Sequence, residues 1–172
     1  VLPLVAPGAE PTATALAVGL THDLTDLFAR WCWFPVIAGI AARGARQRGD
    51  TVKDLGERLG ARFLVDGTLR AAADAWRLGI SIAEAPSGRC VFSATYDFPR
   101  AELFSVQDEV CQAVVAAAYP QLIAAAQVVV ARGSADLGAW ELTHRALLRQ
   151  GARDRSGNLD AQADFRSAIA QD

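Results

Sequence analysis

The sequence contains no methionine, and only three cysteines and two histidines among its 172 residues. Cys32, Cys90 and Cys111 are an odd number, form no CxxC pair and have no histidine close by in the sequence. This pattern argues against a zinc site and against a complete disulfide framework. We expect buried, unreactive thiols, because a free cysteine mostly packs as a small apolar residue.

The usual catalytic motifs are also missing. The sequence has no HExxH motif, no glycine-rich phosphate loop and no nucleophile motif. His22 and His144 lie on different expected helices, where surface or helix-packing roles account for them. No pair of acidic residues is marked out to hold catalytic metal ions. We therefore expect no catalytic residue, no metal and no cofactor in this chain, and hence no enzyme activity.

The chain has little excess charge and no apolar run of membrane-spanning length. The formal charge of −2 and the isoelectric point near 5.7 give no general attraction for nucleic acid or for anionic lipid. We read no apolar segment of about 18 to 20 residues and no leader with a cleavage site, so we expect no membrane insertion. The opening Val1-Leu2-Pro3, without methionine, indicates a piece cut from a longer protein, with the cytoplasm favoured over the periplasm.

Residues 59–70 combine a helix end with a buried strand. Phe63, Val65, Gly67 and Leu69 alternate with more polar neighbours, which predicts a central strand with one apolar face. Gly67 has no side chain, so we expect a bulge there or a helix packed close against the sheet.

The remaining patterns place the other elements. We expect strands at residues 1–5 and 33–40, the latter despite Pro35, and two further strands around 76–82 and 90–96. Helices are expected at about 12–31, from a capping box at Thr51 and Asp54 to Gly60, and from 101 to about 131, with a kink or a split at Pro120. The fold class is therefore α/β (α+β), with a mixed sheet of about five strands in the order β-α-β-α-β-β-β-α.

A change in composition at Gly133 and Ser134 predicts a domain boundary. Residues 1–132 form the α/β domain, and residues 133–172 form two helices, about 136–149 and 158–171. In the second helix Ala161, Phe165 and Ile169 recur every four residues, a stripe typical of tetratricopeptide repeats. One such pair buries its own face poorly, so we interpret it as a truncated array.

The helix pair is expected to expose an apolar interaction surface. Two arrangements cover it: the pair folds back on the long helix around residues 114–130, or two copies meet in a symmetric dimer. We favour the dimer, because the valine-rich long helix is more apolar than one sheet face requires. The residues expected on this surface are Leu142, Leu147, Leu148, Phe165 and Ile169.

Two places in the chain have side chains suited to a small ligand. The basic loop carries Arg43, Arg46 and Arg48, which suit a phosphate, although a solvated connection is the favoured interpretation. Asp66 lies inside a core strand, where it binds a ligand or, as we favour, pairs with Arg62, Arg70 or a backbone donor.

The order of several short motifs resembles the TolB amino-terminal-like domain. That domain occurs in bacterial signalling proteins, next to class III adenylate/guanylate cyclase domains or CadC-type winged-helix domains and ahead of tetratricopeptide repeats. The motifs are Val1-Leu2-Pro3, Gly19-Leu20-Thr21-His22-Asp23-Leu24, Leu59-Gly60-Ala61-Arg62-Phe63-Leu64-Val65-Asp66-Gly67-Thr68, Tyr96-Asp97 and Leu103-Phe104-Ser105-Val106-Gln107-Asp108-Glu109.

The resemblance implies a regulatory module. Our first hypothesis is a non-catalytic sensory and protein-interaction region, most readily of a class III cyclase, with protein partners bound through the helical repeats. The alternatives are the sensor region of a winged-helix transcriptional regulator, a small-molecule-binding domain and an unrecognised hydrolase.

Overall fold

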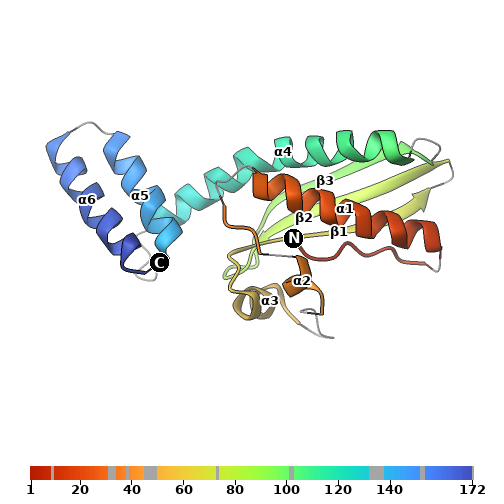
Figure 1. Ribbon diagram of the computed structural model, residues 1–172, viewed down its shortest axis with the longest axis horizontal. Coiled ribbons are helices and arrows are strands. Elements are labelled where there is room, and N and C mark those ends of the chain that lie inside the picture. The colour runs from red at the N-terminus through yellow and green to blue at the C-terminus, as the bar shows by residue number, and fades with distance from the viewer. Residues whose placement is uncertain are drawn as a thin grey trace. The chain divides into compact units, whose positions relative to one another are not determined.

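The structure is a computed structural model, and it describes residues 1–8, 10–30, 34–37, 39–44, 50–72, 74–100, 103–131, 138–151 and 154–171. The chain divides into two compact units, residues 1–119 and 120–172, so that the long helix α4 contributes to both. Figure 1 shows the elements, which are α1 (Pro11–Arg30), α2 (Gly39–Ala42), α3 (Val52–Leu59), β1 (Phe63–Ala72), β2 (Ala75–Glu84), β3 (Cys90–Pro99), α4 (Leu103–Ala131), α5 (Ala139–Gly151) and α6 (Arg155–Ile169).

The first unit has a mixed α+β fold built on an antiparallel meander. The strand order is β1-β2-β3, with Val65 opposite Ile82 and Leu78 opposite Tyr96. The predicted meander is confirmed. The central strand is β2 rather than β1, and the irregularity in the sheet lies between Ile82 and Ala83, whereas β1 pairs with β2 in one unbroken register through Gly67.

The prediction of about five strands is wrong for the part of the chain that the structure describes. Residues 1–5 do run along the free edge of β1, where the Leu2 N–H donates to the Val65 carbonyl at 2.8 Å and Val5 forms one parallel bridge with Thr68. Pro3 has no N–H to continue this ladder. Residues 34–37, which include Pro35, form no strand, and α2 begins at Gly39; residues 33 and 38 lie outside the described residues.

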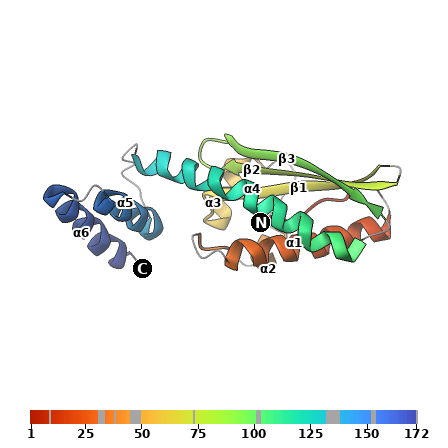
Figure 2. The same ribbon diagram turned by 90° about the horizontal axis from the view of Figure 1, so that it is seen from above.

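One face of the sheet carries the core. Figures 1 and 2 show α1 and the first part of α4 side by side on this face. The strands contribute alternate residues, as expected for a half-covered sheet. The buried side chains include Leu16, Leu20, Leu24 and Phe28 of α1, Leu69, Trp76, Leu78, Ile80 and Ile82 of the sheet, and Val110, Cys111, Val114, Val115 and Ala118 of α4.

The predicted caps of α3 are confirmed. The Asp54 N–H donates to Thr51 Oγ1 at 3.2 Å, and the Thr51 N–H donates to Asp54 Oδ2 at 2.9 Å, which completes a capping box. Gly60 ends the helix with φ of 62°, a left-handed conformation that favours glycine. Leu55 then packs with Leu64 and other buried residues next to the start of β1.

We expect Thr51→Ala to lower the free energy of unfolding by about 1 kcal/mol, because the capping hydroxyl is lost. Lys53→Ala is the matched control: Lys53 lies on the same helix, is largely exposed and forms only a 3.7 Å surface pair with Glu57. Such surface changes stay within about 0.5 kcal/mol. Urea unfolding of both variants measures the difference, and equal stability of the two would contradict a stabilising cap.

The long helix α4 runs through Pro120 without a break, so the predicted split does not occur. Its residues Gln107–Val128 are long and apolar enough, by length and composition only, to cross a membrane. The prediction that the chain has no apolar segment of membrane-spanning length is therefore wrong for α4. Its face around Val110, Val114 and Ala118 is buried within the first unit, which is the pattern of a core helix.

The second unit contains the predicted pair of helices. Helix α6 starts at Arg155, earlier than predicted, because the Asp154 side chain accepts a hydrogen bond from the Gly157 N–H at 2.6 Å and caps it. The predicted stripe is wrong in detail: Ala161 is buried, but the next buried residues are Asp164 and Ala168, and Ile169 is 78% exposed.

Candidate functional site

The face of the sheet that α1 and α4 leave uncovered is lined by small polar side chains. The strand register aligns Asp66, Ser81 and Ser93 in one row across the three strands. The next row holds Thr68, Gly79 and Thr95. Strand alternation directs these side chains away from the apolar core. These two rows therefore make this part of the sheet face polar.

An ion pair between Arg77 and Asp97 lies on the same face, in the row after Gly79 and Thr95. Arg77 donates to both carboxylate oxygens of Asp97, at 2.7 Å and 2.8 Å, across neighbouring strands. The bond from Arg77 lowers the pKa of Asp97 below its ordinary value. A lowered pKa means that the pair stabilises the fold above the ordinary pKa of an aspartate, and that this contribution is lost as the pH falls through the lowered value.

The structure describes two of the four predicted ligand residues, Asp66 and Arg43, and gives them different partners. Asp66 is half-buried, and its Oδ1 accepts a hydrogen bond from the Gly67 N–H at 2.9 Å, which confirms the favoured interpretation of a backbone partner. Arg43 is exposed, and its Nη2 lies 3.3 Å from His22 Nε2 on α1. Arg46 and Arg48 lie outside the described residues.

Motifs far apart in the sequence meet where α1 and α4 pack. The Gln107 side-chain amide donates a hydrogen bond to Asp23, and a side chain added at Gly19 would meet the same amide at 3.0 Å. The neighbouring Thr21 hydroxyl accepts the Leu4 N–H at 3.0 Å, which ties the N-terminal segment to α1. These motif residues hold the unit together, a role that the sequence pattern did not reveal.

Cys111 lies one turn beyond Gln107 on α4 and is fully buried. Burial, with the nearby carboxylates of Asp23 and Asp108, raises the pKa of its thiol to about 12. The thiolate is therefore scarce at neutral pH, as predicted for an unreactive cysteine. Cys90 is exposed, contrary to the prediction, and its thiol donates to the Phe92 carbonyl at 3.1 Å. Cys32 lies outside the described residues.

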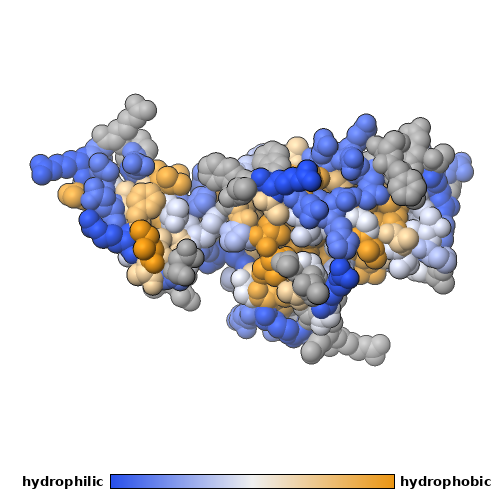
Figure 3. Space-filling model, viewed as in Figure 1, coloured by the Kyte–Doolittle hydropathy of each residue, from blue (hydrophilic) through white to orange (hydrophobic). Residues whose placement is uncertain are grey.

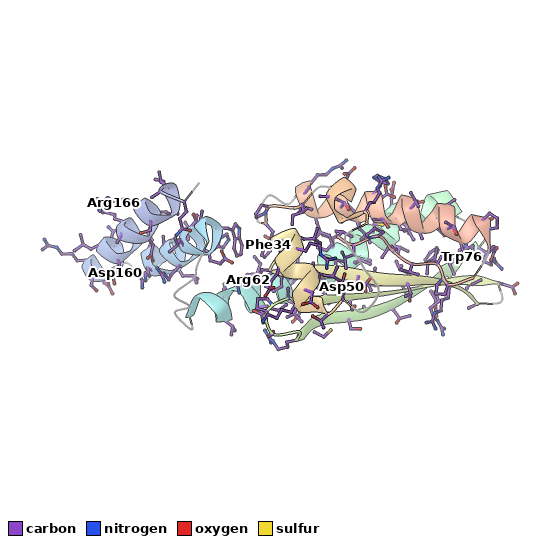
Figure 4. The ribbon with its side chains drawn as sticks, turned by 90° about the horizontal axis from the view of Figure 1, so that it is seen from below. Phe34, Asp50, Arg62, Trp76, Asp160 and Arg166 are labelled. Carbon is purple, nitrogen blue, oxygen red and sulfur yellow. The ribbon has the colours of Figure 1, made fainter. Side chains whose placement is uncertain are left out.

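A second unpredicted cluster holds the end of the sheet where β1 turns into β2. The Arg100 guanidinium lies 4.4 Å from the ring centroid of the buried Trp76 and pairs with Glu10 at 2.5 Å. Figure 4 shows Trp76 at this end, and Phe34 and Arg62 near the opposite end of the strands. The stacking covers the ring and fixes the start of α1 against the hairpin.

The helix pair is joined by a buried carboxylate. Asp164 of α6 accepts two hydrogen bonds from Arg145, at 2.9 Å and 2.6 Å, and a third from Arg149 at 2.7 Å. The Asp164 side chain is only 7% exposed. An aspartate carries no hydrophobic signal in the sequence, yet this one is buried and joins α6 to α5.

The five residues predicted for the interaction surface differ in their exposure. Leu142 is a correction, because it is buried with Ala168 between the two helices. Phe165 is half-buried. Leu147, Leu148 and Ile169 are exposed, and Figure 3 shows hydrophobic patches on this unit.

Among the residues that the structure describes, no three His, Cys, Asp or Glu side chains gather into a group that could hold a metal ion. Several carboxylates instead have structural partners: Asp54 in the α3 cap, Asp97 with Arg77, and Asp164 with Arg145.

No family model matches the chain. It is 26% identical over 147 residues to a protein of Rhizobium meliloti (strain 1021) named "Putative adenylate cyclase 3". The match covers 85% of this chain and 25% of that protein, so the chain spans about a quarter of its relative's length.

Two solved structures have a weaker similarity, both of the LpoB C-terminal domain. The domain from Salmonella enterica aligns with a TM-score of 0.30 and 10% identity, and the domain from Escherichia coli with a TM-score of 0.33 and 9% identity. Each alignment covers 58% of this chain and 78% of the other.

Proposed function

We propose that this chain is a non-catalytic regulatory and protein-interaction region of a larger signalling protein, and that the larger protein is an adenylate cyclase. The observation that carries the proposal is the similarity to one quarter of a protein named as an adenylate cyclase. A cyclase needs carboxylates that hold metal ions at the nucleotide. In this chain Asp54, Asp97 and Asp164 are engaged in a cap or in ion pairs.

The two units offer different surfaces for a regulatory role. The first unit presents a polar sheet face around Ser81 and Thr95. The second presents exposed Leu147, Leu148 and Ile169 on paired helices, as expected for the start of a tetratricopeptide array that binds protein partners. The assignment to the TolB amino-terminal-like family belongs to the same proposal and rests on the motif order.

A small-molecule sensor is the second candidate function. It is favoured by Asp66, a carboxylate on a core strand that faces away from the apolar core. A ligand that binds only the folded chain raises its melting temperature as the ligand concentration passes Kd. A thermal-shift screen with nucleotides, amino acids and sugars therefore separates a sensor from a protein-interaction region.

We expect the isolated chain to form no cyclic AMP from ATP with Mg²⁺ or Mn²⁺ above the rate without protein. The measurement is a cyclic AMP assay at high protein concentration. Turnover that is lost in a purified variant such as Asp66→Asn would contradict the proposal, because activity would then depend on this chain and not on a contaminating enzyme.

A further inference from the structure

The outer edge of β3 has no strand partner within the part of the chain that the structure describes. Among the described residues, β3 pairs only with β2, and Figure 2 shows β3 at the margin of the sheet with α4 to one side of it. Residues 90–98 contain no lysine, arginine or proline, the residues that usually block such edges. Residues 92–98, which lie beyond the irregularity in β3, form a regular edge that is a template for another strand.

The hydrogen-bond pattern identifies the backbone groups at this edge. The Arg100 N–H donates to the Asp74 carbonyl at 3.0 Å, which continues the β2–β3 register beyond Ala75 and Pro99. Bonded and non-bonded pairs alternate in an antiparallel ladder. Phe98, Tyr96 and Ala94 therefore bond to β2. By the same alternation, Ser93, Thr95 and Asp97 direct their N–H and carbonyl groups outward.

The bonds on the other side of the sheet give the same alternation. The N-terminal segment bonds to Val65, Gly67 and Leu69 of β1. The residues between them therefore bond to β2, which leaves Trp76, Leu78 and Ile80 to bond to β3. Two independent sets of hydrogen bonds thus assign the outward groups of β3 to the same residues.

We propose that β3 pairs antiparallel with β3 of a second copy of this chain, about a two-fold axis through Thr95, to form one continuous sheet. In this register Thr95 faces Thr95 of the second copy, and Ser93 faces Asp97. Each of these pairs exchanges two backbone hydrogen bonds. In this register the three outward residues, Ser93, Thr95 and Asp97, pair only with one another. Val91, the extra residue at the irregularity of β3, is not needed for the pairing.

The side chains that face each other in this register are compatible with pairing. Paired threonines favour cross-strand association, whereas like charges directly opposite would oppose it. Asp97, the acidic residue of β3, meets a serine in this register and keeps Arg77 as its partner within its own chain. A two-fold, self-complementary contact is also the commonest way in which soluble chains associate.

Helix α4 runs along the β3 side of the sheet (Figure 1), so a second copy at this edge would also meet the helix. Tyr119 of α4 contacts Phe34, which in turn contacts Phe63 at the start of β1. Helical spacing places Ala117 on the flank opposite Tyr119, away from β1, and both Ala117 and its neighbour Ala113 are exposed. Alanine side chains let two helices approach closely. An extended peptide partner would have no use for this flank, so we infer a second copy. The inference does not rest on the proposed function.

The test compares Thr95→Pro with Thr95→Val in the full chain by sedimentation velocity over a concentration series. Proline at 95 removes an outward N–H and leaves the ladder to β2 intact, as at tolerated edge positions. We expect a dimer for the original chain and for Thr95→Val, and at least tenfold weaker association for Thr95→Pro. A monomer at all concentrations, or a dimer unaffected by Thr95→Pro, overturns the inference.

Two further variants cover a folding failure of Thr95→Pro and an interface on the helix pair. If circular dichroism shows that Thr95→Pro has lost its fold, Thr95→Lys replaces it, because two lysines then face each other across the axis. Leu147→Lys tests the helix pair as the interface instead. We expect that variant to dimerise like the original chain, and loss of the dimer in Leu147→Lys alone would place the interface on the helix pair and overturn the inference.

Discussion

Gly67→Ala is expected to destabilise the first unit by about 3 kcal/mol, the upper part of the usual range for overpacking. A Cβ at this position would lie 2.5 Å from the Gly79 carbonyl oxygen, 2.7 Å from Ile80 Cδ1 and 2.8 Å from Leu4 Cδ2. One of these contacts is with backbone, which cannot turn aside as a side chain can. Gly67→Val adds further atoms at the same place, so it should be at least as damaging.

Gly79→Ala is the matched control, because Gly79 lies on the neighbouring strand one register position away, opposite Thr68. Its Cβ would meet Thr68 Oγ1 at 3.6 Å, an ordinary contact distance. We expect a change within about 1 kcal/mol, the range in which glycine and alanine differ in a strand. Urea unfolding measures both variants. Similar midpoints for Gly67→Ala and Gly79→Ala would show that the sheet relaxes around Gly67.

Asp164→Ala is expected to destabilise the helix pair by about 3 kcal/mol, because breaking a buried ion pair costs about 3–5 kcal/mol. We expect the lower end of that range, since the Arg145 and Arg149 side chains are 23% and 39% exposed and can turn toward water. Hydrogen exchange followed by mass spectrometry isolates this unit. A loss of 3 kcal/mol corresponds to roughly a hundredfold faster exchange in α5 and α6.

Asp160→Ala provides the comparison for this change. Asp160 is on the same helix and exposed (Figure 4), so its removal should shift stability by no more than about 0.5 kcal/mol. Unchanged protection of α5 and α6 in Asp164→Ala would mean that the ion pairs contribute nothing to the contact between these helices.

The parts of the fold that follow from local patterns could be predicted. Alternating residues around Trp76 and Ile80 indicated the hairpin strands, and Thr51 with Gly60 marked both ends of α3. The prediction failed where an apolar run had no clear period. Residues 33–40 were interpreted as a strand, but the described part forms none, and α2 begins at Gly39.

Contacts between distant residues could not be predicted. The bond from Gln107 to Asp23 joins residues 84 positions apart, and no periodicity relates them. In α6 the stripe of Ala161, Phe165 and Ile169 was preferred because it is apolar, whereas the helix turns Asp164 toward α5. A hydrophobic pattern cannot predict the burial of a carboxylate that accepts hydrogen bonds from two arginines.

The central proposal is that this chain regulates a cyclase without taking part in its chemistry. The most direct test measures kcat and KM for ATP of the whole parent protein and of a version that lacks these 172 residues. The proposal predicts that the shortened protein still forms cyclic AMP, with an unchanged KM for ATP and a kcat that differs severalfold. A tenfold or larger rise in KM would contradict it, because the chain would then form part of the nucleotide site. An unchanged kcat together with an unchanged KM would contradict it as well, because no regulation would then come from this region.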